Sequence, residues 1–293
     1  MLAELENDGI WYIPLKGSIL KDYYPQIGMR QMSDNDILFD PDCNNDVKSV
    51  MENLGFVVKH FGRSNHDVYF KPPVCNFEMH NELFLPQYGE TIYDYYSNVK
   101  NRLIKDENNN NGFHFTNEDF YVYITAHEYK HFMQGGTGLR NLVDRYVFLD
   151  KFSDSLDMAY IENELAKMQI TDYERNARNL TLKLFNGVKL SDDEKKLLDY
   201  YILSGTYGTT ENLVENRLKR NGGGIAAKVR YISSRFFVPI NKNNQSYKSY
   251  AAEYPLFYKY KLLLPLLPLY RLYKSIIKSR KRILTEIKTL IKL

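Results

Sequence analysis

A polar run at residues 106–112, Asp-Glu-Asn-Asn-Asn-Asn-Gly, separates two parts of this chain that follow different hydrophobic patterns. Before the run, short apolar segments of strand length alternate with turn residues and brief helical stretches. After it, apolar residues recur at helical spacing over longer segments. The run itself is typical of a linker. We therefore predict an α+β domain over residues 1–105, a mainly helical domain over 113–220 and a basic helical segment over 225–293.

The apolar patterns also indicate where individual strands and helices lie. In the first part, strands are expected at residues 11–15, 37–39, 56–58, 67–70 and 74–84, and helices at 18–24 and 45–54. In the second part, helices are expected at residues 117–134, 139–152, 157–168, 172–185 and 191–204. Thr116 is suited to cap the first of these later helices. Ser191 with Glu194 forms a capping-box pattern at the last of them.

The positive charge of the chain is concentrated at its C-terminal end. Residues 255–293 carry a net charge of +9, with ten Lys or Arg and one Glu, whereas the preceding 254 residues carry −6. From Leu269 to Ile291 the apolar residues fall on one stripe of a helix, with Lys and Arg on the other face. Three interpretations of this basic helix stay open: it packs on the body, binds RNA phosphates, or lies on a membrane surface.

Composition excludes several classes of protein. Hydrophobic residues make up 44% of the chain and aromatic residues 14%, which a disordered protein would not have. The two cysteines, Cys43 and Cys75, show no framework spacing, which suits a reducing compartment. The first residues lack the basic and apolar regions of a signal peptide, and no apolar run is long enough to span a membrane. We therefore expect a cytoplasmic protein without a transmembrane segment; its oligomeric state is not predicted.

Two aspartates at the start of an expected strand form the candidate catalytic centre. Asp34 and Asp36 flank Asn35, and side chains two residues apart in a strand point to the same face. Two carboxylates held together repel unless a divalent cation lies between them, and Mg²⁺ binds through one or two carboxylates plus phosphates. Upstream, Gly17 lets the backbone approach a phosphate closely, and Ser18 can donate a hydrogen bond to it. This combination is suited to phosphoryl transfer, in which a metal pair activates a hydroxyl and stabilises the leaving pyrophosphate.

These segments resemble the signature of the polymerase-β-like nucleotidyltransferase superfamily, Gly-Ser followed by Asp-x-Asp. More closely, Leu-Lys-Gly-Ser, Tyr-Pro, Gly-Met-Arg and Ser-Asp-Asn-Asp-Ile-Leu resemble, in that order, the bacterial uncharacterised nucleotidyltransferase family. The resemblance implies a mixed sheet with flanking helices, a bound Mg²⁺ or Mn²⁺, and transfer of a nucleoside monophosphate from an NTP to an acceptor hydroxyl. It also implies a third carboxylate from a neighbouring strand, for which we choose Glu78 in Phe-Glu-Met-His. Asp67 and Glu82 are the alternatives to Glu78.

The resemblance extends into the helical part and implies further nucleotide contacts. It includes His-x-x-Lys130-His and Gly-Leu-Arg140-x-x-x-Asp144. Under it, Lys130 contacts the triphosphate, while Arg140 and Asp144 line the opposite wall of a cleft between the two domains. Abortive-infection nucleotidyltransferase toxins are similar in placing a Lys and an Asp on helices after the metal site. Lys16 and Arg30 are additional candidates for nucleotide contact, and a salt bridge between Lys130 and Asp144 is the alternative to binding. Relatives commonly carry helices before the first strand, so we expect an N-terminal portion to be missing.

A second motif favours a different class of enzyme. His127-Glu128-Tyr-Lys-His131 matches the His-Glu-x-x-His helix of zinc metallopeptidases, in which the histidines bind Zn²⁺ and the glutamate acts as base. Lys130 follows His127 by one helical turn, so its charge would oppose a zinc ion there. A distant residue such as Glu162 could be the third ligand, but no pattern marks it. A non-catalytic nucleotide- or RNA-binding protein of the same fold is a further interpretation.

Overall fold

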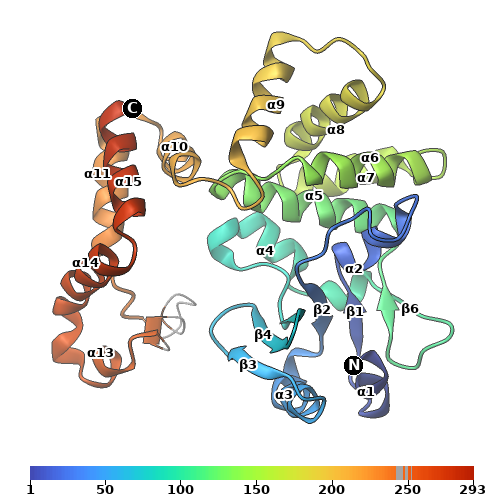
Figure 1. The fold of residues 1–293 in the computed structure, drawn as a ribbon, viewed down its shortest axis with the longest axis horizontal. Coiled ribbons are helices and arrows are strands. Elements are labelled where there is room, and N and C mark those ends of the chain that lie inside the picture. Colours follow the sequence, from blue (N-terminus) through green and yellow to red (C-terminus); the bar gives the residue numbers. More distant parts are fainter. Residues whose placement is uncertain (242–246, 248–249, 252) are drawn as a thin grey trace. The chain divides into compact units, whose positions relative to one another are not determined.

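The computed structural model describes residues 1–241, 247, 250–251 and 253–293 (Figure 1). The chain divides into two compact units. The first consists of Met1–His127 with Val143–Thr181, and the second of Glu128–Leu142 with Leu182–Leu293. The domain boundaries near residues 105, 113 and 220 were predicted from sequence as limits of independently folding domains. These domain boundaries stay a prediction.

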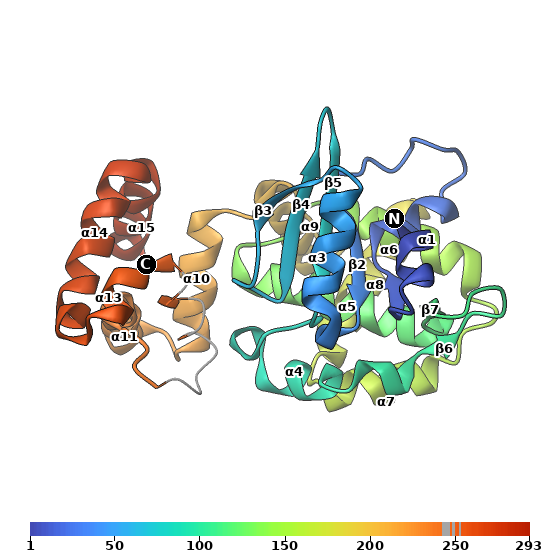
Figure 2. The ribbon, with the colours of Figure 1, turned by 90° about the horizontal axis from the view of Figure 1, so that it is seen from below.

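The first unit is built on a five-stranded mixed sheet (Figure 2). Its strands in chain order are β1 (Tyr12–Pro14), β2 (Asn35–Phe39), β3 (Val57–His60), β4 (His66–Lys71) and β5 (Cys75–His80). In space their order is β1-β2-β5-β4-β3. Strands β2 and β5 run parallel, and the other neighbouring pairs are antiparallel. The parallel neighbours β2 and β5 are therefore joined by a crossover connection. Along each strand, successive side chains point to opposite faces of the sheet.

One face of this sheet is apolar. It packs against two helices, α1 (Leu2–Asn7) and α3 (Asn44–Asn53). Ile37 and Phe39 of β2 and Met79 of β5 are each no more than 2% exposed there. Because side chains alternate along a strand, the residues between these three point to the opposite face. The opposite face, called the polar face below, thus carries the alternate residues of the two strands: Asp36, Leu38, Glu78 and His80.

The other helices of the first unit lie between and after the strands in the sequence. They are α2 (Gly17–Leu20), α4 (Glu90–Tyr96), α5 (Asn117–Gln134), α6 (Arg140–Phe152), α7 (Met158–Lys167) and α8 (Thr171–Phe185), of which α5, α6 and α8 continue into the second unit. Short 3₁₀ segments lie at η1 (Lys21–Tyr23), η2 (Pro41–Cys43), η3 (Pro86–Tyr88) and η4 (Val99–Arg102). Asp119 N donates a hydrogen bond to Thr116 Oγ1 at 3.0 Å, so the predicted cap of α5 is confirmed.

The asparagine-rich run that suggested a linker is a turn held against the sheet domain. It joins β6 (Ile104–Lys105) to β7 (Phe113–His114), which form a two-stranded antiparallel sheet. Asn111 N donates to Glu6 Oε1 at 3.0 Å, and Tyr12 N donates to Asn111 O at 2.9 Å. The side chains of this run are polar because they lie at the surface and bind backbone, as turn residues commonly do.

The second unit is helical. Its further elements are α9 (Asp192–Ser204), α10 (Thr210–Arg220), α11 (Gly224–Phe236), α13 (Pro255–Lys259), η5 (Lys261–Leu266), α14 (Leu267–Lys278) and α15 (Arg280–Lys292). The predicted capping box at α9 is confirmed: Glu194 N donates to Ser191 Oγ at 3.3 Å, and Ser191 N donates to Glu194 Oε2 at 2.7 Å. Val214 of α10 and Tyr231 of α11 belong to the buried core of this unit.

The single C-terminal helix predicted over residues 269–291 is wrong, because the chain breaks at Ser279 into α14 and α15. Ser279 is non-helical, with φ −137° and ψ 35°, and beyond it α15 contacts other helices of this unit. Leu290 of α15 packs against the core between α10 and α11, and Glu286 forms an ion pair with Arg235 of α11. Leu290 lies outside the predicted apolar stripe. The residues of that stripe are exposed: Leu269, Leu272, Tyr273, Ile276, Ile277, Leu284, Ile287 and Ile291.

The α+β class predicted from sequence, a mixed sheet with flanking helices followed by a helical region, is confirmed. One strand is shorter than predicted: β5 ends at His80, not at residue 84. Beyond it one further hydrogen bond, from Asn81 N to Asn65 O at 3.0 Å, follows the last strand pair of β4 and β5. Within the described ranges, no helix has both the length and the apolar character that crossing a membrane requires.

Candidate active site

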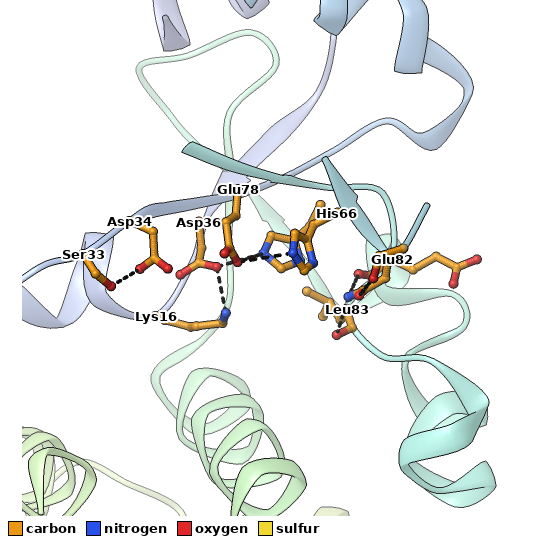
Figure 3. Close-up of polar contacts among 11 residues, drawn as sticks. Lys16, Ser33, Asp34, Asp36, His66, Glu78, Glu82 and Leu83 are labelled. Carbon is orange, nitrogen blue, oxygen red and sulfur yellow. Dashed lines mark hydrogen bonds and ion pairs between the residues drawn. The ribbon is translucent and has the colours of Figure 1, made fainter. Parts of the chain in front are cut away.

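The register of the two central strands places two of the predicted carboxylates together. Strands β2 and β5 pair Asp36 with Glu78, and directly paired residues of neighbouring strands point to the same face. Asp34 lies just before β2, and Figure 3 shows its side chain on the same side of that strand as Asp36. Asp34 Oδ1 accepts a hydrogen bond from Ser33 Oγ at 2.9 Å. The carboxylates of residues 34, 36 and 78 therefore point to one face, opposite the apolar face that packs on α1 and α3.

Asp36 is held in its ionised form by two neighbours. It is 5% exposed, and its Oδ1 atom lies 2.7 Å from Lys16 Nζ and 2.8 Å from His80 Nε2. Burial by itself would raise the pKa of Asp36, but the charge of Lys16 and the hydrogen bond from His80 outweigh it. Together they hold the pKa of Asp36 well below its usual range. A buried carboxylate that is ionised in this way attracts cations.

Lys16 reaches Asp36 from a strained turn between β1 and α2. Its φ angle is +45°, in the left-handed region that side chains other than glycine rarely adopt. The turn is closed by hydrogen bonds, because Ser18 N donates to Leu15 O at 3.0 Å and Leu20 N donates to Lys16 O at 2.9 Å. A strained residue that ion-pairs with a buried carboxylate motivates a functional hypothesis for both, since such strain tends to occur at functional sites.

A buried tyrosine lies within electrostatic range of Asp36 and Glu78. Tyr123 of α5 is 1% exposed. Burial raises the pKa of its hydroxyl well above the usual value, and the charges of Asp36 and Glu78 raise it further. Both carboxylates therefore act electrostatically on one buried phenol.

Gly17 leaves room for an arginine that holds the connection between β1 and β2. A Cβ atom at Gly17 would collide with Arg30 Nη1. The Nε and Nη2 atoms of Arg30 donate to Oδ1 and Oδ2 of Asp144 at 2.8 and 2.9 Å, a bidentate pair. The Tyr24 hydroxyl also donates to Asp144 Oδ1, at 2.6 Å. Arg30 and Asp144 thus fix this connection to α6, and a contact of either with a nucleotide stays a prediction.

Ser18, the second residue of α2, offers an unused donor. Its Oγ atom is buried, and it has no hydrogen-bond partner among the residues that the structure describes. Buried polar atoms are seldom left unsatisfied, so one that is calls for an explanation such as a ligand. A phosphate oxygen would supply the acceptor that this hydroxyl lacks.

Two histidines that sequence reasoning did not select lie beside Glu78. Strands β4 and β5 pair His66 with His80, and Glu78 lies two residues before His80 on the same face. Glu78 Oε2 is 3.7 Å from His66 Nε2 and 3.8 Å from His80 Nε2 (Figure 3). The signal that could have found them is Pro72-Pro73, a turn pair midway between the two histidines, which predicts a hairpin that brings them opposite each other.

Neither alternative to Glu78, Asp67 or Glu82, is placed by strand pairing on the same face of the sheet as Asp36. Asp67 pairs with Met79, so it shares the apolar face of the sheet, where it is 1% exposed. Its Oδ1 accepts a hydrogen bond from Gly62 N at 2.6 Å. Glu82 follows the end of β5, outside the ladder, and its backbone oxygen accepts from Asn65 Nδ2 at 2.9 Å. Strand register therefore favours Glu78 as the third carboxylate.

Other predicted residues belong to the second unit. Lys130 of α5 and Arg140 of α6 are part of it, and their contacts with a nucleotide stay a prediction. Glu128, the glutamate of the His-Glu-x-x-His motif, is 6% exposed and accepts a hydrogen bond from the Tyr201 hydroxyl at 2.7 Å. A metallopeptidase would need this carboxylate to take a proton from water. In this structure the Glu128 carboxylate already accepts a hydrogen bond from a phenol.

The residues on the polar face suit a divalent cation. Carboxylate oxygens are the ligands that Mg²⁺ prefers, and Asp34, Asp36 and Glu78 supply them from two neighbouring strands. The ammonium of Lys16 already binds Asp36, which demonstrates that the buried carboxylate attracts positive charge. Among the described residues, however, the ligand atoms found within 4.8 Å of one another are those of His66, Glu78 and His80, a group without Asp34 or Asp36. An ion held by all three carboxylates therefore stays a prediction.

A comparison with known families identifies the family of this chain. The family described as "Uncharacterised nucleotidyltransferase" has a sequence model that matches residues 1–186. The match covers more than half of the chain, so the chain belongs to this family, as its sequence resemblance predicted. The matched residues include the carboxylates of the polar face and the Gly17-Ser18 turn. Neither the curated proteins nor the solved structures contain a significant match to the chain.

Proposed function

We propose that this protein is a Mg²⁺- or Mn²⁺-dependent nucleotidyltransferase of the polymerase-β type. It would move a nucleoside monophosphate from an NTP to an acceptor hydroxyl and release pyrophosphate. The observation that carries the proposal is the pairing of Asp36 with Glu78 on one face of the sheet, in a chain of a nucleotidyltransferase family. Phosphoryl transfer depends mainly on positioning and on charge stabilisation, which rigid central strands can supply.

The carboxylates would act as ligands. Asp34, Asp36 and Glu78 would hold the ion, which when bound supplies activation of the acceptor hydroxyl and stabilisation of the leaving pyrophosphate. Asp36 needs no proton loss to do so, because Lys16 and His80 keep its pKa low. His80 also orients Asp36 through their hydrogen bond of 2.8 Å.

The turn between β1 and α2 would receive the phosphates. Ser18 Oγ would donate to a phosphate oxygen, since it lacks a partner in the described part of the chain. The side chain of Lys16 is long and 18% exposed, so its ammonium can leave Asp36 for a phosphate oxygen. Arg30 and Asp144 would hold Gly17 in place, and Lys130 and Arg140 remain candidates for contacts with the triphosphate.

The partners of the reaction are an NTP and an acceptor that bears a hydroxyl. An RNA end is one candidate acceptor because residues 255–293 carry ten basic side chains and one acidic. Binding of RNA by such a segment would weaken steeply with added salt, since phosphate contacts release counterions.

The proposal is tested by incubating the protein with each labelled NTP, Mg²⁺ and pools of acceptors, and by measuring pyrophosphate release. We expect release that requires the ion and falls at least about 100-fold in Asp36→Asn, which lacks a ligand charge. Asp46→Asn is the matched control, because Asp46 is exposed on α3, beside the other face of the sheet. It should keep full activity.

Two outcomes would contradict the proposal and support a rival function. NTP binding without pyrophosphate release from any acceptor would favour a non-catalytic nucleotide- or RNA-binding protein. Peptide hydrolysis that is lost in His131→Ala and kept in Asp36→Asn would favour the metallopeptidase. Full transfer activity in Asp36→Asn would leave nucleotidyl transfer intact but refute the site.

A further inference from the structure

A cluster of three metal-ligating side chains adjoins the carboxylates but contains two nitrogen ligands. One ligand atom from each of His66, Glu78 and His80 lies within 4.8 Å of the other two, and Glu78 Oε2 is 3.7 Å from His66 Nε2 and 3.8 Å from His80 Nε2. In a tetrahedral site, ligand atoms at about 2.0–2.1 Å from Zn²⁺ lie roughly 3.4 Å apart. The observed separations of 3.7 and 3.8 Å from the glutamate oxygen are close to that spacing. Small side-chain rotations would bring the three atoms onto one ion.

The sheet holds this cluster in place. His66 and His80 are directly opposite on β4 and β5, and Glu78 shares their face. Their two rings are 5.0 Å apart between centroids. Ligands on paired strands are positioned more accurately than ligands on loops. The arrangement therefore results from strand register and needs no induced fit of the backbone.

The cluster combines accessibility with negative charge. The side chains of His66 and Glu78 are 28% and 24% exposed, whereas that of His80 is 5% exposed. An ion can thus enter from the side of His66. Asp36 brings a second carboxylate, because its Oδ1 lies 2.8 Å from His80 Nε2. A dication at His80 Nε2 would take the place of the hydrogen bond between His80 and Asp36, and the imidazole proton would then lie on Nδ1.

We propose that His66, Glu78 and His80 hold a divalent transition-metal ion of the Zn²⁺ type, separate from the Mg²⁺ of the transfer reaction. Imidazole suits Zn²⁺, Co²⁺ and related ions, whereas Mg²⁺ prefers oxygen ligands only. Glu78 belongs to both sets. A carboxylate has two oxygen atoms, so one glutamate can bridge two neighbouring ions. The polar face would then carry a mixed centre, with an imidazole-bound ion beside the nucleotide site.

The experiment titrates the full-length protein with Co²⁺ alone, without nucleotide, and follows the visible ligand-field bands of the bound ion. We expect one Co²⁺ per chain, with bands typical of nitrogen ligation, that a large excess of Mg²⁺ does not remove. In His66→Ala the affinity should fall at least about 100-fold, since one of three protein ligands is lost. His60→Ala is the matched control, because His60 lies exposed on the neighbouring strand β3 and should bind Co²⁺ like the wild type.

The outcomes separate this inference from the proposed function. Asp36→Asn should still bind Co²⁺, although it should lose nucleotidyl transfer, so either claim can fail while the other stands. Thermal unfolding of His66→Ala checks that the variant is folded, and Glu78→Gln provides a second variant of the same site. Absence of Co²⁺ binding by the wild type, or equal binding by folded His66→Ala, would overturn the proposal. Loss of Co²⁺ in His131→Ala, with binding kept in His66→Ala, would instead place the ion on α5.

Discussion

The two faces of the five-stranded sheet differ in what their buried residues do. On one face Ile37, Phe39 and Met79 pack against α1 and α3, and their burial stabilises the fold. On the other face Asp36, Glu78 and His80, which adjoin these residues in sequence, are polar or charged and lie close together, beside the buried Leu38. The same two strands supply both sets. A change of one position along β2 or β5 should therefore move an effect from stability to activity.

The largest difference is expected between two carboxylates on paired strands that point to opposite faces. Glu78→Gln should lower turnover at least about 100-fold with little effect on stability, because it removes a proposed ligand charge from a partly exposed side chain. Asp67→Asn should leave turnover unchanged and lower the free energy of unfolding by about 1–3 kcal/mol, because it weakens the buried bond to Gly62 N. Steady-state kinetics and urea unfolding measure the two effects. Equal effects of both variants on turnover would break the comparison.

A cavity created on the apolar face should lower the stability of the protein and leave its turnover unchanged. Met51 of α3 is fully buried against β2 and β5. Met51→Ala should lower the free energy of unfolding by about 2–5 kcal/mol, because it removes buried methylene groups and leaves a cavity. Denaturant unfolding gives this value, and turnover of the folded fraction should equal that of the wild type. An unchanged unfolding free energy would indicate that this face is not the core of the unit.

The bidentate pair between Arg30 and Asp144 tests whether a polar contact near the site is structural. Arg30→Lys keeps the charge but loses the planar fork, so we expect a loss of about 1–3 kcal/mol in unfolding free energy. Arg63→Lys, an exposed matched control, should have no effect. If Arg30→Lys raised the KM for NTP with no change in stability, Arg30 would contact the nucleotide directly and would not act by fixing the Gly17 turn.

The smallest effect is expected at a buried carboxylate away from the polar face, and this effect should depend on pH. Glu164 is 3% exposed and accepts hydrogen bonds from Tyr95 and Arg102 at 2.7 and 3.0 Å. Burial acts to raise the pKa of Glu164, but its hydrogen bonds to Lys167, Tyr95 and Arg102 lower it overall. The stabilisation is therefore present above the pKa of the unfolded carboxyl, about 4.3, and is lost as pH falls through the lower folded value.

Thermal unfolding at a series of pH values measures the contribution of Glu164 to stability. Glu164→Gln should be less stable than the wild type by about 1 kcal/mol near neutral pH. The difference should shrink as the solution becomes more acidic than the pKa of the folded carboxyl. A difference between the two proteins that grows on acidification would contradict the lowered pKa.

Local residue patterns predicted the elements of the site better than its contacts. The strand after Asp34 and Asp36 was predictable because Ile-Leu-Phe follows a pair of turn-forming residues, and the resemblance to a family pointed to Glu78. The pairing of Arg30 with Asp144 was not predictable, since it joins residues 114 positions apart. The break at Ser279 separates α14 from α15, which packs against α10 and α11, and the helical spacing of the segment does not encode it.

Strand register accounts for most of what sequence reasoning missed. The cluster of His66 with His80 exists only because β4 and β5 pair in one register, and a shift by one residue would send the two side chains to opposite faces. The turn at Pro72-Pro73 carries that information, but alternation within each strand does not. Alternation within a strand thus predicts the face of a residue, whereas its partner across the sheet follows only from the position of the turn.

The most direct test of the account is a crystal structure of the protein with Mn²⁺ and a non-hydrolysable NTP analogue, in which anomalous scattering locates the ion. We predict an anomalous peak within coordination distance of the carboxylates of Asp34, Asp36 and Glu78, bridged to the phosphates, with Ser18 Oγ bonded to a phosphate oxygen. A nucleotide bound elsewhere, with no ion in contact with these carboxylates, would contradict the claim that the polar face of the sheet is the catalytic centre.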